Sequence, residues 1–288
     1  MQTVSEALRN AIDAGNPQRV LFVFSGNVEY TNEDIAISSG VELNEEFNSE
    51  RNITIGLTPS STLSFTLLNE NNQLSGLNFG WFHFYIGARI DEGAPTEITR
   101  NYTENGESVT YAFAKIGTFY AKKPDVIKKK TVSVTAYDRM VLFDRDMPSS
   151  ATLGISYPTT IGNILTKMCS YISVSLESSS FLNNDLTVDS EPKDFRTATM
   201  RQVVSWIAEC ACSTARFNRA GNLELVWFST ASGALYDEHN YKGFDYAWYE
   251  TTGINGLYCR DTTKATETQD GTTKTNNYLI QDNPFLMD

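Results

Sequence analysis

The sequence predicts a β-rich α+β protein, with an antiparallel β-barrel or sandwich over residues 1–137, an α+β domain over 138–240 and further β-like segments over 241–288. Three observations predict this class. Short runs of β-branched and aromatic residues, separated by Gly and Asn, fill most of the first 137 residues. Apolar residues then recur at helical spacing in two stretches. From Tyr241 onward the β-like runs return.

The first part begins with one short amphipathic helix, Ser5–Ala14, which stops at Gly15 and places on one side Val4, Leu8, Ala11 and Ile12. Strands follow. In the run TLSFTLL the apolar residues Leu63, Phe65 and Leu67 alternate with polar ones, which is typical of an antiparallel sheet with one buried face. The expected strands are Arg19–Ser25, Ile35–Leu43, Arg51–Leu57, Thr62–Leu68, Phe79–Ile90, Glu97–Tyr102, Val109–Tyr120 and Thr131–Tyr137.

In the second part, residues 138–240, the spacing of apolar residues changes from strand-like alternation to helical spacing. Arg139–Phe143 continues the preceding strand, and the turn DRDMPSS ends it. Two helices are expected, Thr159–Leu176 and Thr199–Cys212, each with a Thr as its cap. Val188–Pro192 is expected to be extended. The last feature is a hairpin of Thr214–Asn218 and Leu223–Phe228, whose turn carries Gly221 and Asn222.

The last part contains three candidate strands, Tyr241–Tyr249, Gly256–Asp261 and Thr275–Gln281. Three strands are few for an independent domain, so they either pair with the first barrel or begin a further domain. The first of them carries an aromatic run formed by Tyr241, Phe244, Tyr246 and Trp248. Such a stripe can bind sugars, but the favoured interpretation is a sheet core or a subunit interface, where aromatic residues are enriched.

Charge and composition exclude several classes of function. With 23 basic and 35 acidic residues the net charge is -12, which makes the chain a poor nucleic-acid binder and a poor ligand of anionic membranes. No signal peptide and no apolar run of membrane-spanning length is present, so we expect a cytosolic protein until assembly moves it. The four cysteines lack redox and zinc spacings and are interpreted as free thiols.

The sequence offers no constellation for catalysis, metal binding or a cofactor. Glycine-rich nucleotide loops, HExxH and GxSxG are all missing, and only two histidines are present. His83 lies in the aromatic run WFHFY and is interpreted as an ordinary strand residue. Asp138, Asp144 and Asp146 could be imagined as acids or calcium ligands, but caps and ion pairs with nearby arginines are the favoured interpretation.

A lysine-rich segment interrupts the acidic chain between two expected strands, at Lys122, Lys123, Lys128, Lys129 and Lys130. One interpretation is a solvated hairpin whose Lys and Pro residues protect a sheet edge. The other is a charge contact between subunits, with an acidic neighbour such as Glu42–Glu50. The sequence leaves both open.

Four stretches, in order, carry a resemblance to a known family: RNITIGLTPSSTLSFTLLN, TVSVTAYDRMVLFDRDM, the pair of helical stretches within residues 157–228, and the final YLIQDNPFLMD. They are spread between Arg51 and Asp288, and none is a catalytic motif. They resemble tail proteins of phages and prophages of Gram-positive gut bacteria, similar to the baseplate hub of contractile tails.

The resemblance implies a structural role. Residues 1–137 would form a first "tube" barrel, 138–240 an inserted α+β domain, and 241–288 part of a second tube barrel. Three copies would form a ring that joins the tail tube to the distal tip and contacts other tail and baseplate proteins. The chain would then belong to the virion tail, and to the host cytoplasm before assembly. The alternatives are a carbohydrate- or receptor-binding module for host cell attachment, and the scaffold part of a tail-associated cell-wall hydrolase.

Overall fold

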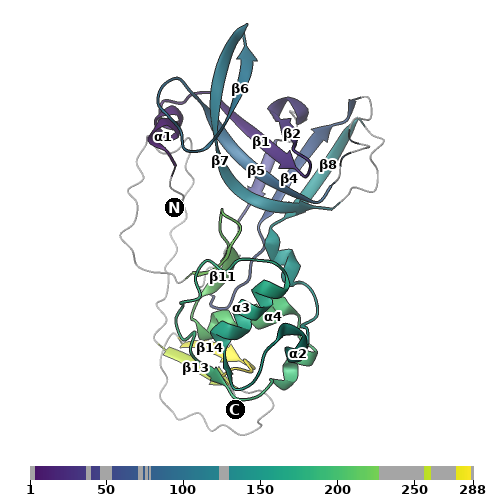
Figure 1. Ribbon diagram of the computed structural model, residues 1–288, viewed down its shortest axis with the longest axis vertical. Coiled ribbons are helices and arrows are strands. Elements are labelled where there is room, and N and C mark those ends of the chain that lie inside the picture. The colour runs from purple at the N-terminus through teal and green to yellow at the C-terminus, as the bar shows by residue number, and fades with distance from the viewer. Residues whose placement is uncertain are drawn as a thin grey trace. The chain divides into compact units, whose positions relative to one another are not determined.

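In the computed structural model the described residues are 4–36, 40–45, 54–70, 74, 77, 79–122, 130–226, 256–260 and 277–286 (Figure 1). The chain divides into two compact units. The first comprises residues 1–45, 60–142 and 217–222, and the second 46–59, 143–216 and 223–288. The domain boundaries expected at residues 137/138 and 240/241 stay predictions.

The first unit is built on one large antiparallel sheet. Its strand order is β2-β1-β5-β7-β8-β4-β3, and β6 pairs with β7 beside this path. The strands are β1 (Gln18–Phe24), β2 (Val28–Thr31), β3 (Val41–Asn44), β4 (Thr62–Leu68), β5 (Trp81–Ile90), β6 (Ile98–Glu104), β7 (Glu107–Ala121) and β8 (Thr131–Tyr137). The prediction of a β-rich α+β protein with an antiparallel sheet is confirmed.

Alternation of side chains explains how this sheet buries a core. In β8 the apolar Val132, Val134 and Ala136 are buried, whereas the residues between them are exposed. β4 lies beside β8 and buries Phe65 opposite Val134. The core that these residues join also receives side chains from β1, β2, β5 and β7. Each buried Phe or Val contributes about 1.5–3 kcal/mol, so the alternation fixes which face turns inward.

Two aromatic rings show that the sheet is strongly curled. Phe22 of β1 and Phe65 of β4 have ring centroids 4.4 Å apart, although three strands lie between β1 and β4 in the sheet. In a flat sheet four steps of about 4.8 Å would separate those strands by roughly 19 Å. The two rings therefore meet across the core.

Strand β7 organises the middle of the sheet because three strands pair with it. β5 pairs along most of its length, β6 pairs with residues 107–113, and β8 pairs only with Tyr120 and Ala121. The register against β5 shifts between Phe84 and Tyr85, which makes Ile116 the extra residue of a β-bulge.

Helix α1 (Glu6–Asp13) packs against the sheet as its apolar pattern predicts. Ser5 caps it by accepting from the Leu8 backbone N–H. Leu8 and Ala11 are buried against alanines of β5 and β7. Ile12 departs from the prediction, because its side chain is 43% exposed.

The second unit combines short helices with two-stranded pieces of sheet. Its elements are α2 (Ser150–Leu153), β9 (Thr159–Thr160), α3 (Ile161–Tyr171), β10 (Thr187–Val188), η4 (Lys193–Arg196), α4 (Met200–Cys210), β11 (Thr214–Phe217), β12 (Leu223–Val226), β13 (Gly256–Arg260) and β14 (Asn277–Gln281). The two predicted helices are confirmed, with Thr160 and Thr199 as their caps, although α3 ends at Tyr171 and not at Leu176, which forms a parallel bridge with Leu223. Strands β13 and β14 pair in parallel.

Three predictions about local structure are wrong. Thr54–Leu57, the described part of the expected strand 51–57, is not a strand, because its backbone bonds to the α4–β11 region instead. Gly56 N donates to Ser213 O at 2.8 Å, and the Ser205 hydroxyl donates to Gly56 O at 2.6 Å. The expected strand 35–43 is regular only from Val41. Finally, Arg139–Phe143 is a 3₁₀-helix, η3, and does not continue β8.

Candidate interaction surface

Most residues predicted for an interface lie outside the described residues. These are the aromatic Tyr241, Phe244, Tyr246 and Trp248, and the lysines Lys123, Lys128 and Lys129. Lys122 and Lys130 are described, and both are exposed at the ends of the β7–β8 connection. The Lys130 carbonyl accepts the Asn69 N–H at 2.7 Å, which anchors one end of that connection.

A row of aromatic side chains that the sequence did not reveal crosses the outer face of the sheet in the first unit. Trp81 of β5 is paired with Tyr120 of β7, and Tyr120 with Tyr137 of β8. Their strand neighbours Phe82 and Ala136 point into the core, so these rings point outward. Tyr120 and Tyr137 remain 41% and 42% exposed. The Trp81 and Tyr120 ring centroids lie 5.2 Å apart at 60°.

The surface next to this aromatic row is uncharged along β4 and β8. The outward residues of β4 are Thr62, Ser64 and Thr66, and they face hydroxyl side chains or Tyr137 on β8. The Thr66 and Ser133 hydroxyls lie 3.2 Å apart. Charged residues make up 20% of the chain, yet these two adjacent strands carry no outward charge. Water can therefore be removed from this surface on binding at a low cost in free energy.

Basic side chains border the other side of the aromatic row. The Arg139 guanidinium lies 6.0 Å from the Trp81 ring centroid, at the limit of a cation–π contact. Lys122 is exposed two residues beyond Tyr120. Burial, together with the nearby Lys115 and Arg139, lowers the pKa of His83, whose Nδ1 lies 3.0 Å from the Thr118 hydroxyl. His83 is thus a strand residue, as its position in WFHFY predicts.

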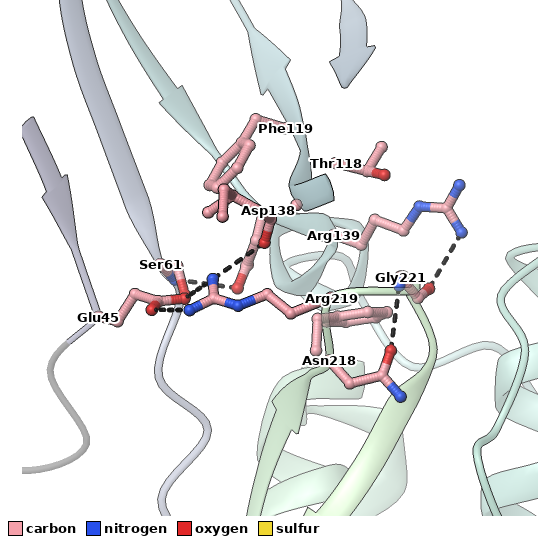
Figure 2. A pocket seen from close by; sticks show the side chains of 12 residues that line it. Glu45, Ser61, Thr118, Phe119, Asp138, Arg139, Asn218, Arg219 and Gly221 are labelled. Atoms are coloured by element: carbon pink, nitrogen blue, oxygen red, sulfur yellow. Dashed lines mark hydrogen bonds and ion pairs between the residues drawn. The ribbon is translucent and has the colours of Figure 1, made fainter. Parts of the chain in front are cut away.

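A small cavity of about 10 Å³ lies beside Asp138 and Arg219 within the first unit (Figure 2). This volume is enough for about one water molecule and too small for an organic ligand. Asp138 accepts from the Ser60 hydroxyl at 2.8 Å and from the backbone N–H groups of Ser61 and Met140 at 2.9 Å each. Burial raises the pKa of Asp138, whereas these hydrogen bonds favour the carboxylate.

Asp138 therefore acts as a cap that joins β4, β8 and η3, in agreement with the favoured interpretation of the sequence. Arg139, one of the nearby arginines expected to form ion pairs, instead donates to Gly221 O at 3.2 Å. Asp144 pairs with Arg201 at 2.5 Å. Within the described part of the chain, no group of three or more His, Cys, Asp or Glu residues could hold a metal ion.

The turn of the β11–β12 hairpin, residues 217–222, belongs to the first unit and meets β7 at its bulge. The Arg219 guanidinium forms a bidentate ion pair with Glu45 and donates to the Ile116 carbonyl at 2.9 Å. This carbonyl belongs to the stretch of β7 between the residues paired with β6 and those paired with β8. Arg219 thus satisfies a backbone acceptor that the ladder leaves open.

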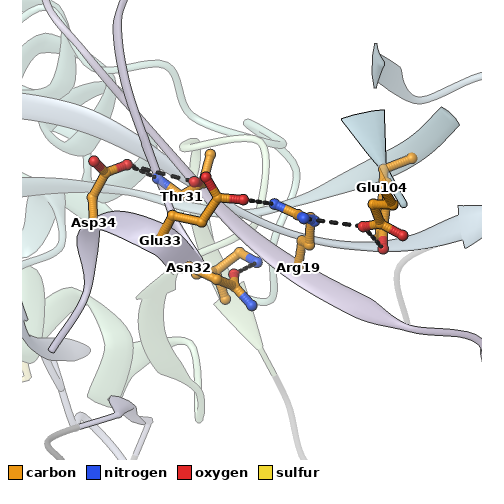
Figure 3. A network of polar contacts seen from close by, with 8 residues as sticks. Arg19, Thr31, Asn32, Glu33, Asp34 and Glu104 are labelled. Carbon is orange, nitrogen blue, oxygen red and sulfur yellow. Dashed lines mark hydrogen bonds and ion pairs between the residues drawn. The ribbon is translucent and has the colours of Figure 1, made fainter. Parts of the chain in front are cut away.

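A second polar network joins β6 to β1 and to the 3₁₀ turn η1 (Asn32–Asp34) that follows β2 (Figure 3). Arg19 pairs with Glu33 and Glu104 at 3.0 Å each, and its guanidinium lies 4.5 Å from the Tyr102 ring centroid. Burial alone would lower the pKa of Arg19, but hydrogen bonds to Glu33, Tyr111 and Glu104 raise it. All of these residues belong to the first unit.

Three cysteines, Cys169, Cys210 and Cys212, form no disulfide. Cys169 and Cys210 are buried and Cys212 is half-buried. Burial raises the pKa of Cys169 to about 12, which keeps this thiol protonated and unreactive at neutral pH. Among the helices of the described residues, none has the length and apolar character needed to cross a bilayer.

Comparisons with known proteins complete this picture. No protein-family model matches the chain, and no curated protein matches it. The chain is similar to the solved structure of a 43 kDa tail protein of prophage MuSo2 from Shewanella oneidensis, with 11% identity and a TM-score of 0.41 over 72% of this chain. It is also similar to a tail protein from Neisseria meningitidis MC58, with 11% identity and a TM-score of 0.41 over 86% of this chain. The chain spans only 53% and 56% of those two proteins.

Proposed function

We propose that this chain is a structural subunit of a phage or prophage tail, located at the tail tip or baseplate hub, and that it catalyses no reaction. The observation that carries the proposal is the order of the four family-like stretches. The first two fall on β4 and β8 of one antiparallel sheet, and the third falls on α3, α4 and the β11–β12 hairpin of the α+β unit. This is the order of barrel and inserted domain that the resemblance implies.

The sheet of the first unit closes into a barrel in this proposal. The contact of Phe22 with Phe65 supports closure, because a barrel brings β1 and β4 together across its interior. The two edge strands of the sheet order also follow one another in the chain. Ile35, which lies between β2 and β3, already forms a bridge with Leu67 of β4. A single continuous segment then passes from the β1 side to the β4 side and completes the wall.

The assembly is a homotrimer in which each chain contributes such a barrel, and residues 241–288 contribute part of a second one. The ring joins the tail tube above to the distal tip below, and its partners are other tail and baseplate proteins. A closed ring requires heterologous contacts, in which two different surfaces of the subunit meet. The protein is then found in the virion tail, and in the host cytoplasm before assembly.

Labelling of particles tests this proposal. Antibodies raised against the full chain should decorate the tail tip of purified phage particles in negative-stain electron microscopy. Particles from a host in which the gene is deleted should lack a complete tip. Particles that carry no label and keep intact tips without the gene would refute the structural role. A clear zone produced by the pure chain on peptidoglycan gels would instead favour a hydrolase.

A further inference from the structure

The aromatic row Trp81–Tyr120–Tyr137 and the exposed Lys122 beside it form a surface on the outer face of the sheet. Packing in the core of the first unit does not explain why these side chains are aromatic. Side chains of this size on a strand's outer face are expensive to hydrate, and two of the three rings keep about two fifths of their surface exposed. Tyr and Trp at the centre of a contact, with a charged rim, are the side chains that dominate binding energies. The surface therefore has the composition of an interface.

Its charge is opposite to that of the whole protein. Lys122 and Arg139 border the rings, and two acids of the described residues near Arg139 are already engaged: Asp138 is buried and accepts three hydrogen bonds, and Glu45 is paired with Arg219. The chain as a whole carries a net charge of -12. Another copy of the chain is thus a partner whose average charge attracts this surface.

A surface of complementary composition lies at the opposite end of β5. Helix α1 presents the exposed Glu6, Arg9, Ile12 and Asp13, and the turn after β5 adds the exposed Asp91 and Glu92, so acids outnumber basic residues on this surface. The turn is held against the helix, since a Cβ on Gly93 would lie 2.9 Å from the Ala7 Cβ. Ile12 adds an apolar side chain to this surface, being 43% exposed.

We infer that the aromatic row, with Lys122 and Arg139, binds the acidic α1 face of a second copy of this chain. This inference rests on the proposed function, for which it names one self-contact of the assembly. The two surfaces differ and lie at opposite ends of a ten-residue strand, about 30 Å apart. Contacts between unlike surfaces propagate around a ring, which is the arrangement that a trimer requires.

Sedimentation velocity of the full chain over a range of concentrations tests the inference. The wild type should self-associate at moderate ionic strength, where salt screens the general repulsion between two chains of net charge -12. The double variant Tyr120→Ser/Tyr137→Ser should raise the dissociation constant at least about tenfold. Its matched control is Tyr171→Ser in the second unit, which removes a ring that is 47% exposed and should leave association unchanged.

A charge exchange tests which surface is the partner. Lys122→Glu should weaken association, and adding Asp13→Lys should restore it, whereas Lys193→Glu, at an exposed lysine of η4, should have no effect. A wild type that stays monomeric, or aromatic variants that associate like the wild type, would overturn the inference. So would binding of an oligosaccharide to the aromatic row of a monomeric chain.

These experiments distinguish failure of the proposed tail role from failure of the inferred self-contact. If the chain is found at the tail tip but its aromatic variants associate normally, the structural role stands and another surface makes the contact. If the chain is missing from particles but the charge exchange behaves as expected, the self-contact stands and the tail role is refuted.

Discussion

The contact of Phe22 with Phe65 makes the curled sheet of the first unit testable in solution. Phe22 is fully buried, and its ring lies 4.4 Å from Phe65 and 5.0 Å from Phe84. Phe22→Leu removes the aromatic contacts and keeps most of the buried volume, so we expect a loss of about 1–1.5 kcal/mol in the free energy of unfolding. Phe22→Ala should lose about 3–5 kcal/mol because it also leaves a cavity.

The decisive quantity is the coupling between the two rings. A double-mutant cycle of Phe22→Leu and Phe65→Leu, measured by urea unfolding, should give a coupling energy of about 0.5–1.5 kcal/mol. The control cycle pairs Phe22→Leu with Phe113→Leu. Phe113 is equally buried but belongs to a separate cluster with Leu21 and Tyr111, so this cycle should be additive within about 0.5 kcal/mol. A coupling near zero between Phe22 and Phe65 would refute the contact across the core, and with it the closed barrel.

Three further predictions concern single sites in the two units. Burial raises the pKa of Asp138 in the folded protein above its unfolded value. Its contribution to the free energy of unfolding is therefore fully present below the unfolded pKa and is lost as pH rises through the folded pKa. In urea titrations at several pH values, the stability of the wild type relative to Asp138→Asn should fall over that window. A flat difference would contradict the shift. Gly56→Ala should lower the free energy of unfolding by at least about 1 kcal/mol more than Gly26→Ala, as measured by thermal unfolding. Both glycines have positive φ, but only at position 56 would the new Cβ overlap a neighbouring side chain. Equal losses in the two variants would contradict this packing. Arg19→Met should speed amide exchange in β6, since it removes the link between β1 and Glu104 of β6 and leaves Glu104 only the Tyr111 hydroxyl; unchanged exchange in β6 would show that the network does not hold this strand.

The local elements of the fold were predictable because their signals are local. The strands Thr62–Leu68 and Thr131–Tyr137 were predicted with the bounds that the structure has, since strict alternation of apolar and polar residues leaves one register for each face. Thr199 was predicted as a helix cap, and it forms a capping box with Gln202. These interactions join residues only a few positions apart.

Errors arose where distant partners decide the conformation. Ile55 and Leu57 made residues 51–57 look like a strand, yet Gly56 has a φ of +78°, and its backbone bonds to Ser205 and Ser213 about 150 residues later. The composition of a short segment does not predict hydrogen bonds to residues so far along the chain. The four-residue strand β2 was overlooked because the Gly26-Asn27 turn that precedes it has positive φ at both residues and leaves little sequence for an alternating pattern.

The candidate surface depends on the same kind of information. Trp81, Tyr120 and Tyr137 stand 39 and 17 residues apart in the sequence, and each by itself reads as one aromatic residue at a strand end. Only the pairing of β5 with β7 and of β7 with β8 places the three rings in one row. The bulge at Ile116 contributes to this placement, because an extra residue in β7 shifts every later side chain by one position relative to β5. Without the bulge Tyr120 would have the opposite parity to Trp81 and would point into the core. The interface that we infer therefore depends on the register that this bulge sets between β5 and the C-terminal part of β7.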